Sequence, residues 1–188
     1  LKAGYAVATP NYDLCAPATL PIIVEQMRRC MTYLHANAGS FGIDPTQFNI
    51  CGTSAGGHLA AYLACDPALP FIRSSLAISG LHELEPVALL PAGRILGLDL
   101  ATAHALSPAH KTPNRGTRVA IAVGELESDE FRRQSRDLAS RWNVPFLAVK
   151  GRVHFNVTDD LNHGGALADL ALELANPTAP AQRGAAAS

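Results

Sequence analysis

The chain has 188 residues, enough for one domain with a substantial hydrophobic core and too few for two. Hydrophobic residues make up 48% of the chain and charged residues 16%, a balance that excludes a disordered protein. The net charge of -1 gives no electrostatic basis for binding nucleic acid or an anionic membrane surface. No apolar run approaches the roughly 18 residues of a membrane span, so a small molecule is the expected partner.

The cysteines and the first residues bear on the cellular setting. The four cysteines form no C-x-x-C pair and show no metal-ligand spacing; they are Cys15, Cys30, Cys51 and Cys65. Three of them lie within or beside apolar segments, where a free cysteine packs as a small hydrophobe. The opening segment LKAGYAVATP lacks the basic end and long apolar stretch of a signal peptide. These features predict reduced thiols, no metal site and a cytoplasmic location.

Strand-like and helix-like segments alternate along the chain. A short buried strand is predicted over residues 4–9, and a helix from about Leu20 whose apolar residues recur on one face. Further strands are predicted at residues 47–51, 74–79, 118–123 and 145–150, and further helices at residues 55–65, 129–142 and 158–175. Strands separated by helices predict a mostly parallel sheet with helices on both faces, an α/β fold.

The predicted domain covers residues 1–175. Within it, residues 81–114 are rich in proline and glycine and are expected to form an irregular, cap-like insert of short helices over one end of the sheet. The tail at residues 176–188 has low complexity and is expected to be disordered. In parallel sheets ligand chemistry gathers at the carboxyl ends of the strands, so catalytic residues are expected directly after strands.

Ser54 is the predicted nucleophile. It lies in the G-x-S-x-G pattern of Gly52–Gly56, between a predicted strand and a predicted helix, which is the strand–turn–helix context that a nucleophile elbow requires. The two outer glycines are expected to give space in a crowded turn. The serine then projects at the start of a helix, where the Ala55 amide and the helix dipole can stabilise an oxyanion.

His154 is the predicted general base. Serine requires a base at neutral pH, and histidine is the usual one. Of the seven histidines only His154 directly follows the last predicted strand, where the chain order serine, acid, histidine of this fold places the base. The other six are expected to pack in the fold or to face solvent.

The acid is expected after the preceding strand, in a segment that offers four carboxylates. Asp129 and Glu130 suit the first turn of the next helix, where negative charge is favourable in any case. Glu125 lies close to the strand end, whereas Glu127 lies at the apex of the loop without a helix-capping duty. Glu127 is therefore the preferred acid, with Asp129 as the alternative.

With these residues placed, the chain resembles the kynurenine formamidase (arylformamidase) branch of the α/β-hydrolases. The resemblance extends to about residue 175. It rests on the segments YAVATPNYDLC, GTSAGGHLAAYLA, ISGLHELEPV, LSPAH and VGELESDEFRRQS and on the pair His154-Phe155. It implies hydrolysis of N-formyl-L-kynurenine in tryptophan breakdown without metal or organic cofactor. It assigns the nucleophile to Ser54, the base to His154 and the acid to Glu127, where relatives commonly have aspartate.

Two points qualify this resemblance. Thr53 stands where relatives often have histidine, and no H-G-G-x-W segment precedes the GYAVA strand, although its amides would form half of the oxyanion hole. We therefore expect an N-terminally truncated α/β-hydrolase, with a catalytically weak fragment or pseudoenzyme as one alternative. A general small-ester carboxylesterase is the other, because the same triad serves many substrates. Tyr12 is a candidate to stack on an aromatic substrate.

Overall fold

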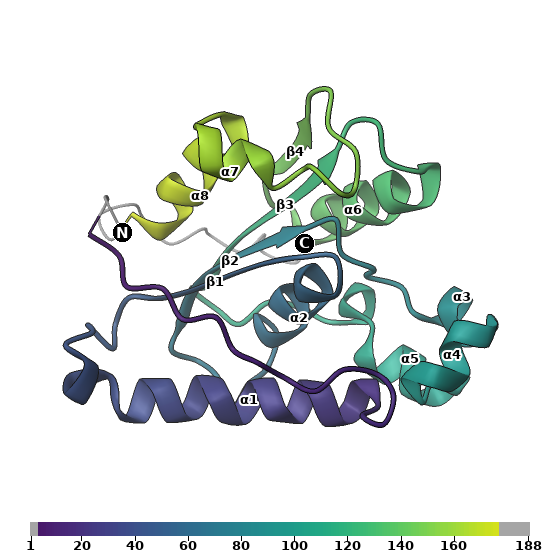
Figure 1. The fold of residues 1–188 in the computed structure, drawn as a ribbon, viewed down its shortest axis with the longest axis horizontal. Helices are drawn as coiled ribbons and strands as arrows, with labels where there is room; N and C mark the ends of the chain where they lie inside the picture. The colour runs from purple at the N-terminus through teal and green to yellow at the C-terminus, as the bar shows by residue number, and fades with distance from the viewer. Residues whose placement is uncertain (1–3, 177–188) are drawn as a thin grey trace, which may run out of the picture.

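The computed structural model describes residues 4–176, in which a four-stranded parallel sheet lies between layers of helices (Figure 1). The strands follow the chain order across the sheet: β1 (Phe48–Thr53), β2 (Ile72–Ile78), β3 (Arg118–Gly124) and β4 (Phe146–Val149). Thr53 pairs with Ile78, Ile78 with Ala122, and Gly124 with Val149. The predicted parallel α/β sheet is confirmed, and the carboxyl ends of its strands share one rim.

The longer helices begin and end close to their predicted limits. Leu20 opens the first of them beside Pro21, a residue suited to a first helical turn. The helices of the domain are α1 (Leu20–Ala36), α2 (Ala55–Leu63), α6 (Asp129–Trp142), α7 (Asp159–His163) and α8 (Ala166–Ala175). The insert contains α3 (Glu85–Ala88), α4 (Pro91–Leu96), α5 (Leu100–Leu106) and the 3-10 turn η2 (Pro108–His110); a second such turn, η1 (Ala38–Phe41), follows α1.

The alternation of side chains along β3 divides the core between two faces of the sheet. Val119 and Ile121 point to one face and pack with α2 and α6. Ala120 and Ala122 point to the other face and pack with Leu167 and Leu174 of α8. Because both faces are covered, β3 is buried along its whole length, as expected of an inner parallel strand.

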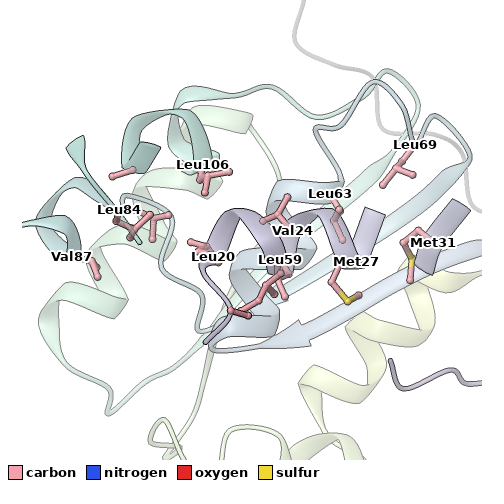
Figure 2. Packing of buried hydrophobic residues seen from close by; sticks show 14 of the residues in the cluster. Leu20, Val24, Met27, Met31, Leu59, Leu63, Leu69, Leu84, Val87 and Leu106 are labelled. Atoms are coloured by element: carbon pink, nitrogen blue, oxygen red, sulfur yellow. The ribbon is translucent and has the colours of Figure 1, made fainter. Parts of the chain in front are cut away.

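Helix α1 packs outside α2 and completes a third apolar cluster (Figure 2). Its buried residues Leu20, Val24 and Met27 recur at helical spacing and pack in one cluster with Leu59 and Leu63 of α2. Leu84, Val87 and Leu106 of the insert join the same cluster. Helix α2 begins directly after Ser54. It is buried against α1 on one side and against the sheet on the other, which explains why it is composed mainly of small and apolar residues.

The predicted strand at residues 4–9 is wrong. This segment is irregular and mostly exposed, and none of its residues pairs with a strand of the sheet. A pocket separates it from β1, lined by Ala6, Val7 and Ala8 on one side and by Ile50 and Cys51 on the other. A strand is stable only when its backbone groups find a partner, and an apolar sequence alone does not supply one.

The single helix predicted over residues 158–175 is also wrong, because Gly164 and Gly165 divide it into α7 and α8. The Asp160 carboxylate accepts a hydrogen bond from the Leu167 amide at 2.8 Å and so caps α8. A Cβ atom on Gly165 would lie 2.5 Å from that carboxylate, so a side chain at this position would displace the cap. Apart from Asn176, the tail predicted to be disordered lies outside the described residues.

The cysteines are free thiols, as predicted. Burial raises the pKa of the Cys65 thiol to about 12, so this group stays protonated at neutral pH. No helix in residues 4–176 has both the length and the hydrophobicity to cross a membrane.

Two histidines are buried, His58 in α2 and His82 at the start of the insert. Nε2 of His58 lies 2.9 Å from the Leu106 carbonyl oxygen, while the His82 side chain is fully enclosed. Burial lowers the pKa of His58 to about 4, and burial together with the neighbouring His58 lowers that of His82 to about 3. Both imidazoles are therefore neutral in the folded protein at pH 7.

We expect this burial to cause acid destabilisation. The unfolded chain binds protons at these histidines below about pH 6.5, whereas the folded protein does not, so stability is lost as the pH falls from there towards 4. Each histidine is expected to lower the free energy of unfolding by about 1.4 kcal/mol for each pH unit in this range. Denaturant titrations at several pH values give the free energy of unfolding as a function of pH. The pH dependence of this free energy should be smaller by about that amount in His58→Gln and unchanged in the exposed control His163→Gln. An equal pH dependence of the free energy of unfolding in the parent and both variants would contradict the conclusion that His58 is buried in its neutral form.

Candidate active site

Ser54 occupies the sharp turn between β1 and α2. Its backbone has φ 56° and ψ -116°, a conformation that residues other than glycine rarely adopt. Two hydrogen bonds hold it there: the Ser54 amide donates to the Ile78 carbonyl at 2.9 Å, and the His58 amide donates to the Ser54 carbonyl at 3.0 Å. The turn therefore lifts the serine side chain out of the sheet at its carboxyl rim.

Close backbone approaches explain the glycines around this serine. A Cβ atom on Gly52 would lie 2.2 Å from the Gly56 carbonyl oxygen, and one on Gly57 would lie 2.3 Å from the Ile78 carbonyl oxygen. A Cβ atom on Gly56 would meet nothing within 4 Å. The expectation that Gly52 and Gly56 both relieve a clash is thus correct for Gly52 and wrong for Gly56, whose role passes to Gly57.

His154 lies in the loop after β4 and faces Ser54. Its Nε2 atom is 3.0 Å from Ser54 Oγ, and its Nδ1 atom is 2.7 Å from Glu127 Oε2. When Nδ1–H donates to the carboxylate, Nε2 is left as the acceptor for the serine proton. Phe131 lies beside the imidazole with ring centroids 4.6 Å apart. Three residues separated by up to 100 positions in the chain are thus brought into one hydrogen-bonded line.

The Glu127 carboxylate is buried and held on several sides. Its side chain is 0% exposed, and Oε1 accepts hydrogen bonds from the Gly124 amide at 2.8 Å and the Ser79 hydroxyl at 2.5 Å. A buried carboxylate requires such donors to remain charged. Ser79 was not singled out from the sequence, although its place directly after β2 is the same signal that indicated Ser54 and His154.

The other carboxylates of this loop point elsewhere. The Asp129 side chain is 96% exposed and pairs with Arg132 on its own helix. Glu130 bonds to Arg133 and Gln134, and these bonds lower its pKa to about 2. Glu125 accepts a hydrogen bond from the Gly151 amide. Among the described residues, the structure therefore brings Glu127, and not the alternative Asp129, to His154.

Ala55 directly follows the nucleophile, whereas Tyr12 lies in a neighbouring pocket. Ala55 is the first residue of α2, so its amide has no acceptor within the helix. Tyr12 is half-buried against the α1 cluster and lines the pocket beside β1, which reaches the nucleophile turn at Gly56. Neither Ser54 nor His154 is among the residues that line that pocket.

Chemically, this arrangement can activate a hydroxyl for attack on a carbonyl carbon. The base accepts the serine proton, the buried carboxylate stabilises the resulting imidazolium, and the start of α2 offers an amide to the oxyanion. A parallel sheet whose rim carries a serine elbow, an acid and a histidine in this order has the α/β-hydrolase fold. The chain is a member of this structural class.

The sequence is similar to that of several named proteins within this structural class. Residues 1–72 match the BD-FAE family. The kynurenine formamidase of Salmo salar is 25% identical in a match of 182 aligned positions that covers 86% of this chain and 59% of that protein. Esterase LipQ of Mycobacterium tuberculosis is 33% identical over 72 residues, or 37% of this chain and 17% of that protein. This chain is thus similar to a kynurenine formamidase, and it spans 59% of the length of that protein.

Solved structures share the fold. A candidate thioesterase from Silicibacter sp. superposes with a TM-score of 0.75 at 28% identity, over 95% of this chain and 63% of that one. A truncated carbohydrate esterase from gut microbiota gives a TM-score of 0.77 at 19% identity, over 93% of this chain and 75% of that one. These neighbours place the sheet and its helices firmly among the α/β-hydrolases.

Proposed function

We propose that the chain is the catalytic part of a serine hydrolase that cleaves the formamide bond of N-formyl-L-kynurenine. The observation that carries the proposal is the line of hydrogen bonds from Ser54 through His154 to the buried Glu127, in a chain similar to a kynurenine formamidase. No metal or organic cofactor takes part in the proposed chemistry, and the substrate is a small molecule.

The proposed cycle is an acyl transfer. Ser54 Oγ attacks the formyl carbon while its proton passes to His154 Nε2, and Glu127 stabilises the imidazolium. The Ala55 amide donates to the oxyanion of the tetrahedral intermediate. The C–N bond then breaks, the amine of kynurenine leaves with the proton from His154, and formyl-serine remains. Water, deprotonated by His154, attacks this ester and releases formate and the free serine.

An exposed aromatic side chain beside the base supports an aromatic substrate. Phe155 is 95% exposed, and its ring lies perpendicular to that of His154 with centroids 5.5 Å apart. An aryl group that leaves the reacting carbon could pack against this ring, because offset and edge-to-face aromatic pairs are favourable. Tyr12 is the second candidate for such a contact.

The second candidate function is a general carboxylesterase that acts on small esters. The carbohydrate esterase among the structural neighbours and Esterase LipQ favour it, and the same triad would serve both reactions. We expect kcat/KM for N-formyl-L-kynurenine to exceed that for p-nitrophenyl acetate. A preference for the ester of about a thousandfold, equal to about 4 kcal/mol in transition-state binding, would overturn the formamidase proposal and support the esterase.

A fluorophosphonate probe distinguishes both enzymes from a pseudoenzyme. Only a serine that a base activates attacks the phosphorus of the probe and displaces its fluoride, so a phosphonyl ester on Ser54 is expected in either hydrolase. A protein that stays unlabelled at Ser54 while it melts cooperatively would support a catalytically weak or non-catalytic domain.

A further inference from the structure

Three short elements of the insert bring two histidines and a glutamate together at the surface. Glu85 begins α3, His104 lies in the last turn of α5, and His110 ends η2. These residues are separated by 6 to 25 positions in the chain. Their spacing matches no metal-binding motif, so only the folded insert reveals that they converge.

Each of the three side chains offers one atom that could ligate a metal ion, and the three atoms lie close together. Glu85 Oε1 lies 3.0 Å from His104 Nδ1 and 2.6 Å from His110 Nε2. The two imidazole rings stack with centroids 3.8 Å apart, and all three donor atoms lie within 4.8 Å of one another. Ligands of a tetrahedral zinc ion, each about 2.0–2.1 Å from the metal, are roughly 3.4 Å apart. Small side-chain rotations would therefore suffice to admit an ion.

The Glu85 carboxylate also has a hydroxyl partner beside the two histidines. The Ser107 hydroxyl accepts a hydrogen bond from the Leu84 amide, and its one proton can go either to Glu85 Oε2, at 3.1 Å, or to the Ala103 carbonyl oxygen, at 2.7 Å. Such a supporting partner is typical of the carboxylates that ligate metals.

We propose that Glu85, His104 and His110 bind a divalent transition-metal ion of the zinc type. Two imidazole nitrogens and one carboxylate oxygen suit Zn²⁺, Co²⁺ or Ni²⁺, whereas Ca²⁺ and Mg²⁺ require oxygen ligands. The His104 side chain is 63% exposed, so an ion can enter from solvent and water can fill its remaining positions. When the ion binds, a proton held between the carboxylate and the imidazole rings is released to solvent.

Binding would add a link between elements of the insert that already pack together. Metal bound at this site would join α3, α5 and η2 through their side chains, in addition to the apolar contacts of Leu84, Val87 and Leu106. Because the ion binds the folded protein and the unfolded chain lacks a formed site, it is expected to raise the melting temperature. The site is separate from Ser54, His154 and Glu127, so its test does not depend on the proposed hydrolase activity.

Calorimetric titration of Zn²⁺ into the metal-free chain near neutral pH tests the proposal. One saturable site is expected, with affinity at least about tenfold weaker in His104→Ala and in Glu85→Gln. The control His163→Ala removes an exposed histidine of α7 and should bind as the parent protein does. Zn²⁺ should also raise the melting temperature of the parent and of this control, but not that of His104→Ala.

Three outcomes would overturn the proposal. The first is the absence of saturable Zn²⁺ binding to the parent chain. The second is unchanged affinity in both His104→Ala and Glu85→Gln when circular dichroism shows that both variants are folded. The third is affinity lost in His154→Ala but retained in His104→Ala, which would assign the ion to the triad instead.

Discussion

Replacing Ser54 by alanine is expected to lower kcat by a factor on the order of 10⁶, because the attacking oxygen is lost and only substrate binding and the oxyanion donor remain. The change deletes a single atom that projects from the turn, and alanine has the same backbone preferences as serine there. The folded structure should therefore persist. Turnover of N-formyl-L-kynurenine and of p-nitrophenyl acetate should fall together, since both substrates use the same nucleophile.

Ser40→Ala is the matched control, since Ser40 is an exposed serine in η1 with a local hydrogen bond to the Asn37 carbonyl. It should leave kcat unchanged and retain fluorophosphonate labelling, which Ser54→Ala should abolish. A Ser54→Ala protein that melts as the parent does and keeps more than about a tenth of its kcat would exclude the proposed nucleophile.

Replacing Glu127 by glutamine is expected to lower kcat by roughly 10⁴. The glutamine amide can donate to His154 Nδ1, which would place the ring proton on Nε2, facing Ser54. The base would then be in the wrong tautomer to accept the serine proton. In that orientation the amide oxygen keeps the hydrogen bonds from Gly124 and Ser79, which a carboxylate oxygen accepts in the parent protein. KM should change far less than kcat.

Asp129→Asn is the comparison that separates the two acids considered from the sequence. Asp129 faces solvent and pairs only with Arg132 on the same helix, a contact of the kind that contributes about 0.3–0.5 kcal/mol at most. Its kcat should stay within about twofold of the parent value. If Asp129→Asn lost activity by orders of magnitude while Glu127→Gln kept it, the assignment of the acid would be reversed.

Local patterns carried most of the fold. Strands β1 to β4 and helices α1, α2 and α6 were predicted close to their observed limits because their apolar spacing, prolines and end residues agree with the tertiary structure. The prediction failed where a distant partner decides. Residues 4–9 have the composition of a strand but no neighbour to pair with, and the break before α8 depends on the Asp160 carboxylate.

The candidate site could be predicted from one rule, that polar residues directly after parallel strands meet at one rim. The rule indicated Ser54 and His154, and the absence of a helix-capping role favoured Glu127 over Asp129. Ser79 directly follows β2 and so fits the same rule, but its partner Glu127 is 48 positions away, and its role in holding the acid could be recognised only in the folded chain. The cluster of Glu85, His104 and His110 was missed for the same reason.

The pairing of neighbouring strands sets the distance between the reacting groups. Ser54 follows Thr53, which stands opposite Ile78, while His154 is anchored through Val149 to Gly124. Sliding β1 by one residue along β2 would carry the hydroxyl about 3.3 Å away, more than a hydrogen bond can stretch. The register of the strands therefore fixes the distance between Ser54 and His154. Insertions or deletions inside a strand should abolish activity even far from the rim, whereas the same changes in the surface connections should be tolerated.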